Sequence, residues 1–453
     1  MQKNALSSSQ RLLVGLTLFS MFFGAGNLIF PPFLGVEAGS DTPAALAGFL
    51  LTAVGFPILG VMAVAESGGL TALAERVEKR FAFLFTLLIY LSIGPCLAIP
   101  RTASTSFEMV VRPALEGAGL LDAAFFGFGS IAISQFIYSA LFFLLAYAIA
   151  LNPEKLTQRL GKYLCPTLIA LIFVLFAGIL FNPIGEAGAP GAAYAASPFA
   201  RGFIEGYQTM DTIAALNFGL VIAMNIRAFG IRTEGVVVKE TVLAGSIAAL
   251  VFFAVYGALA YIGAEAGGAF SGMENGAQTL TLVASALYGP VGSILMGLIF
   301  FIACLNTCVG LISCCANYFS ETFPVMGYRG WARIFAVVSM AIANAGLTLI
   351  LKFSVPLLVA IYPIAIVLIV LGLLSLAYKR LLTLRALYPS VVLATGVFSV
   401  LAGLEAFGLR VPVLSDFADT LPFAANGLEW LLPAVVGAAA GVVLSRIGVR
   451  KAA

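Results

Sequence analysis

The stretch "LTLFSMFFGAGNLIFPPFLG" at residues 16–35 is apolar enough to cross a lipid bilayer, yet it contains glycines at its centre. The apolar run is interrupted by Gly24, Ala25, Gly26 and Asn27, and two prolines follow shortly afterwards. Backbone groups that leave helical geometry inside a membrane must face protein or a water-filled cavity, because hydrocarbon offers no hydrogen-bond partner. The sequence therefore predicts a membrane helix that is broken at its centre.

The composition indicates that most of the chain lies in a membrane. Of 453 residues, 61% are hydrophobic and 10% are charged, whereas soluble domains carry roughly 25% charged residues. Apolar runs of about 20 residues, which span a bilayer as helices, recur along the chain. The first run lacks a small-residue cleavage site, so we expect it to remain in the mature chain. We predict an all-α polytopic membrane protein with twelve transmembrane helices, at about 11–34, 43–65, 81–107, 130–151, 163–184, 208–228, 241–264, 290–319, 332–351, 354–376, 389–408 and 429–446.

The basic residues predict the orientation of these spans. Of the 24 Lys and Arg residues, only a few fall in segments that face outward when the amino terminus lies inside: Arg112, Arg201, Lys352 and Arg410. This distribution follows the positive-inside rule and places both termini in the cytoplasm. The net charge of +3 therefore reflects topology, and we expect a lipid bilayer and no nucleic acid as partner. Oligomeric state is left open.

The sixth predicted span, 208–228, contains a second interruption, around Leu216, Asn217, Phe218 and Gly219. Interrupted helices in corresponding positions of two halves indicate the binding site of a transporter. Because the two broken spans are five helices apart, the second half must run with inverted topology. We therefore predict one transmembrane domain over 1–453, with inverted five-helix repeats at about 11–184 and 208–376 and accessory helices at about 389–446.

The first break is suited to an ion or a charged ligand. A half-helix that starts near Asn27 presents free N–H groups and a positive dipole end, which suit a carboxylate. The carbonyls that end the preceding half suit a cation or an ammonium group. The alternative is that the glycines only allow helices to pack closely. Since a second break exists, we favour a substrate site made by Gly24, Ala25, Gly26, Asn27, Leu216, Asn217, Phe218 and Gly219, with Ile93 and Ala98 of the third span against the apolar part of the substrate.

A family resemblance adds to these observations. The stretch 16–35 and "GPCLAIPRTASTSFEM" at 94–109 resemble the signatures of bacterial branched-chain amino acid:cation symporters, the LIVCS family of BrnQ-type carriers. The resemblance extends over essentially the whole chain. It implies import of leucine, isoleucine and valine across the bacterial inner (cytoplasmic) membrane, driven by a cation gradient, usually sodium. It also implies the LeuT-like fold, with five-plus-five inverted repeats and broken helices 1 and 6.

The coupling cation is predicted from the charges inside the spans. Proton-coupled carriers typically use a buried carboxylate or histidine, and this chain has no histidine. Apart from Arg101, we expect no charged residue well inside a span, so sodium is favoured and no other cofactor is expected. A proton-coupled carrier of small neutral amino acids remains the alternative.

The segment "VGLIS" at 309–313 is similar to the part of the LeuT-like fold that lines a sodium site. The resemblance implies the Val309 carbonyl and the Ser313 hydroxyl as ligands, together with the carbonyls of Ser20 and Phe23. Where the pattern of that fold has a second hydroxyl, this chain has isoleucine, so Thr307 is the candidate replacement. The alternative is that these polar groups join helices to one another.

Arg101 is expected near the outer mouth, as a gate residue that pairs with Glu108 or Asp211. Interfacial snorkelling is the alternative. An enzyme is not expected, because no nucleophile–base pair, metal triad or phosphate loop can be assembled and the commonest general base is missing. A channel would not need two broken helices. The six cysteines lie in or beside apolar runs, so they are interpreted as packing residues and not as metal ligands.

Overall fold

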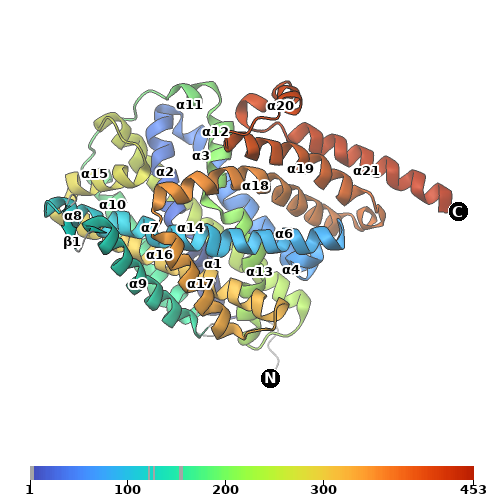
Figure 1. Cartoon of the computed structure of the whole chain (residues 1–453), viewed down its shortest axis with the longest axis horizontal. Helices are drawn as coiled ribbons and strands as arrows, with labels where there is room; N and C mark the ends of the chain where they lie inside the picture. Colours follow the sequence, from blue (N-terminus) through green and yellow to red (C-terminus); the bar gives the residue numbers. More distant parts are fainter. Residues whose placement is uncertain (1–4, 121–122, 126–127, 153–156, 453) are drawn as a thin grey trace.

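The computed structural model describes residues 5–120, 123–125, 128–152 and 157–452, and this part of the chain is almost entirely helical (Figure 1). A short antiparallel pair, β1 (Ala124–Phe125) and β2 (Phe128–Gly129), precedes α9. The helices are α1 (Ser8–Phe22), α2 (Ala25–Ala38), η1 (Gly39–Asp41), α3 (Thr42–Leu50), η2 (Leu51–Gly55), α4 (Phe56–Ser67), α5 (Leu70–Ala74), α6 (Lys79–Leu91), η3 (Ser92–Cys96), α7 (Ala98–Val110), α8 (Arg112–Gly117), α9 (Ser130–Ala150), η5 (Thr157–Leu164), α10 (Cys165–Phe181), α11 (Ala192–Ala196), α12 (Pro198–Glu205), η6 (Gly206–Thr209), α13 (Asp211–Ala228), α14 (Glu234–Ala269), α15 (Gly276–Tyr288), α16 (Pro290–Thr322), α17 (Tyr328–Ala343), α18 (Leu347–Ala377), η7 (Lys379–Thr383), α19 (Leu387–Ala406), α20 (Pro412–Asp419), η8 (Ala424–Asn426) and α21 (Leu431–Ala452).

The prediction of an all-α polytopic membrane protein is confirmed. In the described residues, eight helical segments are long and apolar enough to cross a membrane, or up to nine if the bent pair formed by Pro198–Thr209 and Asp211–Ala228 is one span. Each of the twelve predicted spans overlaps at least one helix. The count of twelve and the division into inverted repeats stay predictions.

The first span is broken where the glycines predicted it. Helix α1 ends at Phe22 and α2 begins at Ala25, so the break falls on Phe23 and Gly24, both of which have extended backbone. The two prolines lie within α2, which continues as a helix to Ala38. The small residues, and not the prolines, therefore mark the break.

The break in the sixth span lies at Met210, and the predicted position around 216–219 is wrong. Met210 adopts a left-handed backbone (φ 68°), and the helical segments on its two sides are bent by 50°. Helix α13 runs uninterrupted through 216–219. A single glycine costs a helix only about 1 kcal/mol relative to alanine. Here Gly219 serves close packing, since a Cβ on it would lie 3.2 Å from the carbonyl oxygen of Val61.

A further interruption, not predicted, divides the third span between α6 and α7. Gly94 in η3 has non-helical backbone (φ −86°, ψ −128°), and Pro95 follows it. A Gly-Pro pair is a common sequence signal of a turn. The consequence is that α7 begins anew at Ala98, with Arg101 in its first turn.

Helices α2 and α14 pack against one another along their length because both present small residues at the contact. A Cβ on Gly263 of α14 would lie 1.9 Å from the carbonyl oxygen of Pro32, and one on Gly35 of α2 would lie 2.1 Å from that of Ala260. Membrane helices are commonly held by such close contacts between small residues. This contact positions the second half of the broken first span.

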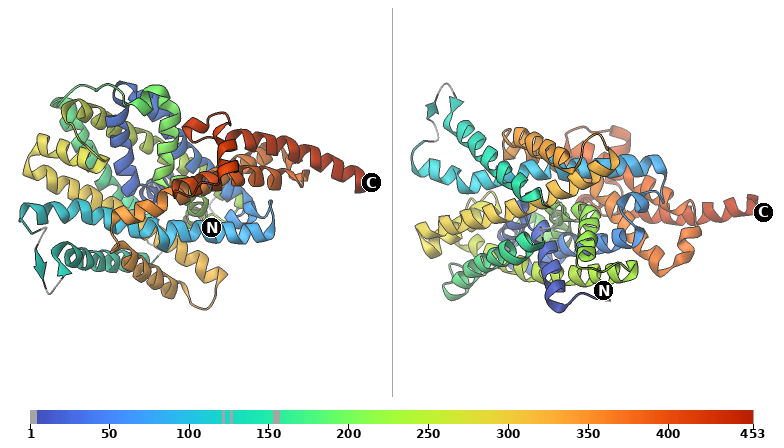
Figure 2. Two further views of the ribbon diagram at one scale, coloured as in Figure 1. Left: turned by 45° about the horizontal axis from the view of Figure 1, so that its top comes forward. Right: turned by 90° about the horizontal axis from the view of Figure 1, so that it is seen from below.

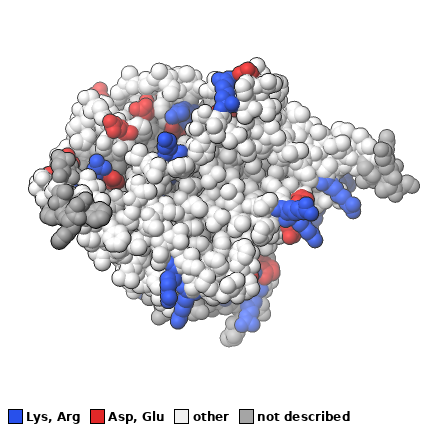
Figure 3. Space-filling view, viewed as in Figure 1, with Lys and Arg blue, Asp and Glu red and all other residues white. Residues whose placement is uncertain are grey.

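The carboxyl-terminal helices lie to one side of the bundle. Helix α19 packs against α18 and α21, and α21 projects beyond the other helices in Figure 1 and in both views of Figure 2. On the face shown in Figure 3, charged side chains lie mostly toward the margins and the central surface is largely uncharged. This distribution agrees with a chain that is surrounded by lipid.

Candidate functional site

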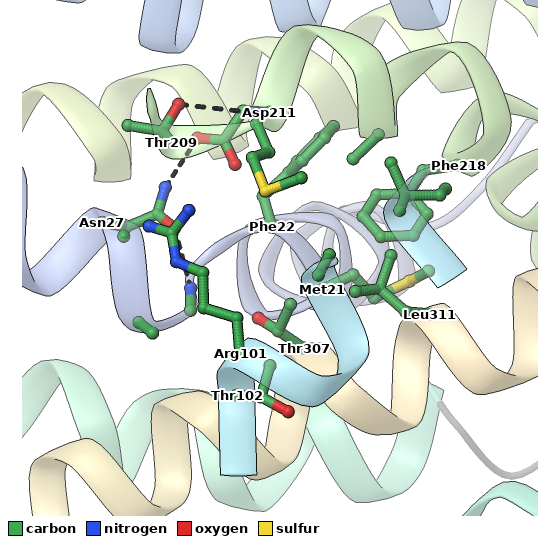
Figure 4. A pocket seen from close by; sticks show the side chains of 17 residues that line it. Met21, Phe22, Asn27, Arg101, Thr102, Thr209, Asp211, Phe218, Thr307 and Leu311 are labelled. Atoms are coloured by element: carbon green, nitrogen blue, oxygen red, sulfur yellow. Dashed lines mark hydrogen bonds between the residues drawn. The ribbon is translucent and has the colours of Figure 1, made fainter. Parts of the chain in front are cut away.

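The broken helices meet at a small cavity of about 40 Å³. Segments of α1, α2, η3, α7, η6, α13 and α16 contribute to its walls. Its lining residues are Met21, Phe22, Gly24, Ala25, Gly26, Asn27, Ile93, Ala98, Arg101, Thr102, Thr209, Met210, Asp211, Ala214, Phe218, Thr307 and Leu311. Figure 4 shows Asn27, Arg101 and Asp211 directed toward one another, with Phe218 and Leu311 further along the cavity.

The break in the first span is held by the side chain of Asn27. The Gly24 amide donates to Oδ1 of Asn27 at 2.9 Å, where a continuous helix would use the carbonyl of Ser20. Asn27 is buried (1% exposed). Its Nδ2 donates to Oδ2 of Asp211 at 2.6 Å and to the hydroxyl of Tyr256. One side chain therefore closes the amino end of α2 and ties it to α13 and α14.

Asp211 is a buried carboxylate at the cavity, and the expectation that Arg101 is the one charge within the spans is wrong. Asp211 is 2% exposed, and its Oδ2 also accepts a hydrogen bond from Tyr256 at 3.2 Å. It starts α13, because the break lies immediately before it at Met210. From the sequence, the same residue was assigned to the end of a span. The pattern Thr-x-Asp before an apolar run is a helix-start signal that could have placed it.

Arg101 lies at the cavity. Its side chain is buried, and Nη1 donates to the carbonyl of Gln208 at 3.1 Å. The guanidinium lies over the ring of Phe30, 5.4 Å from its centre. A Cβ on Gly26 would lie 2.5 Å from Nη2. The cation therefore rests directly on the first turn of α2.

The expected pairing of Arg101 with Glu108 is wrong. Glu108 forms an ion pair with Arg112, one helical turn away on the same segment, with 2.7 Å between Oε2 and Nη1. Helical geometry favours such i,i+4 pairs over a partner on another helix. Glu108 is absent from the residues that line the cavity.

The predicted substrate residues divide into two groups. Seven of them line the cavity: Gly24, Ala25, Gly26, Asn27, Ile93, Ala98 and Phe218. Leu216, Asn217 and Gly219 do not, because α13 is a regular helix there and turns these residues elsewhere. Asn217 is buried, and neither of its amide atoms has a hydrogen-bond partner within the described chain. The lining residues that the sequence did not single out are Met21, Phe22, Thr102, Thr209, Met210, Ala214 and Leu311.

The predicted sodium ligands lie on α1, on α16 and, for Phe23, at the break itself. Helices α1 and α16 contact each other. Thr307 lines the cavity next to the break, since a Cβ on Gly24 would lie 2.8 Å from its hydroxyl oxygen. Within the described residues, the hydroxyls of Thr307 and Ser20 have no hydrogen-bond partner. The Ser313 hydroxyl donates to the Val309 carbonyl at 2.8 Å. The neutral oxygens therefore exist in the expected helices, and their role stays a prediction.

Comparison with known proteins decides the family. Residues 7–448 match the family described as "Branched-chain amino acid transport protein". The chain belongs to this family. It is 38% identical over 445 residues to the branched-chain amino acid permease BraB of Bacillus subtilis (strain 168), covering 98% of this chain and 97% of the permease. It is 40% identical over 443 residues to the permease BrnQ of the same organism, covering 97% and 98%.

This membership confirms the family resemblance seen in the sequence. The relatives are named as permeases, which confirms the prediction that the chain is not an enzyme. A solved structure of Mhp1, a nucleobase-cation-symport-1 family transporter in a closed conformation with bromovinylhydantoin bound, matches with a TM-score of 0.57. The match covers 93% of this chain and 96% of Mhp1 at 15% identity. It confirms the predicted LeuT-like fold.

Proposed function

We propose that the protein is a secondary active transporter that imports leucine, isoleucine and valine by symport with sodium. The observation that supports this most directly is the cavity at the broken helices, in a chain whose relatives are named as branched-chain amino acid permeases. Broken helices at mid-membrane are the usual site of substrate and ion binding in such folds.

The apolar part of the cavity supports branched aliphatic substrates. Met21, Phe22, Ile93, Phe218 and Leu311 offer hydrocarbon to a side chain. Each buried methylene is worth only about 0.8 kcal/mol, so leucine, isoleucine and valine should differ little in affinity. A charged side chain would lose its hydration without gaining a partner there, and should be rejected strongly.

Sodium coupling is supported by the neutral oxygens beside the break. The Ser20 and Thr307 hydroxyls lack partners in the described chain, and the Gly24 amide does not occupy the Ser20 carbonyl. Together with Phe23, Val309 and Ser313, these groups form the proposed ligand set. Hard cations such as sodium are bound by oxygen ligands of this kind.

Coupling to protons is the second candidate, because Asp211 is a buried carboxylate at the cavity. Carboxylates inside membrane spans commonly relay protons in transporters. This candidate differs from the first in the gradient that it needs, and not in the substrate.

Uptake of radiolabelled leucine by the purified protein in liposomes separates the two candidates. We expect uptake to follow an inward sodium gradient and to be competed by isoleucine and valine, but not by lysine or glutamate. Equal uptake without sodium under an acid-outside pH gradient would favour protons. Absence of uptake under both gradients would contradict leucine transport itself.

For the sodium site, we expect Ser313→Ala to raise the sodium concentration for half-maximal uptake by about tenfold, the equivalent of losing one polar contact. Leucine affinity at saturating sodium should change little, because the remaining ligands still hold the ion. Sodium-dependence curves and melting temperatures are measured on the same variant. A lowered melting temperature with an unshifted sodium curve would assign Ser313 to helix packing, with Thr307→Val the next variant to test.

We further propose a location in the bacterial inner (cytoplasmic) membrane with both termini in the cytoplasm. The support for it is the distribution of Lys and Arg along the sequence, which obeys the positive-inside rule.

A further inference from the structure

Arg101 carries a positive charge that the described protein does not neutralise. Its side chain is 4% exposed. Nη1 donates to a backbone carbonyl, that of Gln208, and Nη2 has no hydrogen-bond partner in the described residues. The ring of Phe30 beneath it offers only a weak cation–π contact. A buried guanidinium with an unused donor is costly to maintain unless a ligand supplies the missing acceptor.

Asp211 is a second buried ionisable group at this place. Its Oδ2 accepts hydrogen bonds from Asn27 and Tyr256, which are neutral donors and bring no positive charge to the carboxyl group. None of the ion pairs found in the described chain joins Asp211 to Arg101. Both side chains line one cavity.

The two charges are placed beside consecutive residues of α2. The Arg101 guanidinium rests on Gly26, and the Asp211 carboxylate is bonded to Asn27. Next to them, the first turn of α2 offers free amide groups and a positive dipole end. The end of the cavity that holds Arg101 and Asp211 is thus charged, and the end near Phe218 and Leu311 is apolar (Figure 4).

We propose, on the basis of the function proposed above, that Arg101 binds the α-carboxylate of the transported amino acid and Asp211 binds its α-ammonium group. A zwitterionic α-amino acid carries both charges on one carbon, so it neutralises both side chains at once. Its aliphatic side chain then extends toward the apolar end. A molecule with the same hydrocarbon but only one charge leaves one of the two buried side chains unpaired, and the site should reject it.

The test compares leucine with three analogues: 4-methylpentanoate, which lacks the amino group, 3-methylbutylamine, which lacks the carboxylate, and leucinamide, whose carboxylate is neutralised. Each competes with radiolabelled leucine for the purified full-length protein. For the unmodified protein we expect every analogue to compete at least about 100-fold more weakly than leucine, because a buried charged group without its partner is strongly unfavourable.

The variants should show a crossed pattern. In Asp211→Asn, leucine binding falls and 4-methylpentanoate approaches leucine in potency, while 3-methylbutylamine stays weak. In Arg101→Gln, 3-methylbutylamine and leucinamide approach leucine, while 4-methylpentanoate stays weak. Arg101→Lys and Asp211→Glu keep the charges and should keep the original ranking. Matched controls are Arg112→Gln and Asp416→Asn, whose ion pairs are exposed and lie outside the cavity.

A structural role for the two charges would give another result. If they only stabilise the helices, the variants lower the melting temperature and leave the ranking of analogues as it was, which overturns the proposal. It is also overturned if the unmodified protein binds a one-charge analogue as well as leucine, a measurement that does not depend on any variant folding. Failure of the unmodified protein to bind leucine would instead contradict the proposed function.

Discussion

Replacing Gly26 by leucine is expected to lower leucine uptake by at least about 100-fold, because small displacements of binding groups have effects of this size. A Cβ at Gly26 would lie 2.5 Å from Nη2 of Arg101 and 3.3 Å from the carbonyl oxygen of Gln208. The guanidinium must therefore leave its place on the first turn of α2. A branched side chain would also fill the space in which a carboxylate reaches the backbone amides.

Uptake and leucine binding are measured together with the melting temperature and the amount of protein in the membrane. Gly257→Leu is the matched control, because Gly257 is also in a membrane-spanning helix and a Cβ there has no neighbour within 4 Å. Gly26→Ala should show a smaller loss in the same direction. Unchanged leucine affinity in Gly26→Leu would assign the glycines of the first span to helix packing.

Gly263→Leu is expected to lower stability by at least about 3 kcal/mol, the upper part of the range for overpacking. A Cβ at Gly263 would lie 1.9 Å from the carbonyl oxygen of Pro32 and 2.6 Å from its carbonyl carbon. Backbone cannot rotate away as a side chain can, so α2 and α14 must separate. Because α2 carries Gly26 and Asn27, separating α2 from α14 should also distort the cavity that these two residues line.

The melting temperature of purified Gly263→Leu should fall by several degrees and less protein should be recovered, with Gly257→Leu on the same helix as the control. Gly263→Ala should already be measurably less stable. If Gly263→Leu melted like the control, the close approach of α2 to α14 would be wrong.

Much of the architecture could be predicted from the sequence, because an apolar run inside a membrane must form a helix whatever it packs against. A helix must satisfy its own backbone, so each apolar run of sufficient length predicts a helix. The break at Gly24 was predictable because two glycines and an asparagine follow one another closely inside such a run. The family resemblance rested on residues close to this break and in the third span.

The position of the second break depended on tertiary structure. Glycine and asparagine at 216–219 occur in a regular helix because α4 packs closely at Gly219. The actual break is at Met210, a residue with no sequence preference for left-handed backbone. The observed break lies about two helical turns before the predicted one. This places Asp211 at the wall of the cavity, whereas the ion and substrate predictions treated it as the end of a span.

What the sequence determined by itself was the class of the protein, its helices, its first break and the family to which it belongs, because these follow from local composition and motif. What only the tertiary structure decided was which charges meet. Arg101 comes from α7, Asp211 from α13 and Asn27 from α2, and nothing in their spacing along the chain relates them. They share one cavity because helices that are distant in sequence pack side by side, and the low dielectric between them makes each unpaired charge significant.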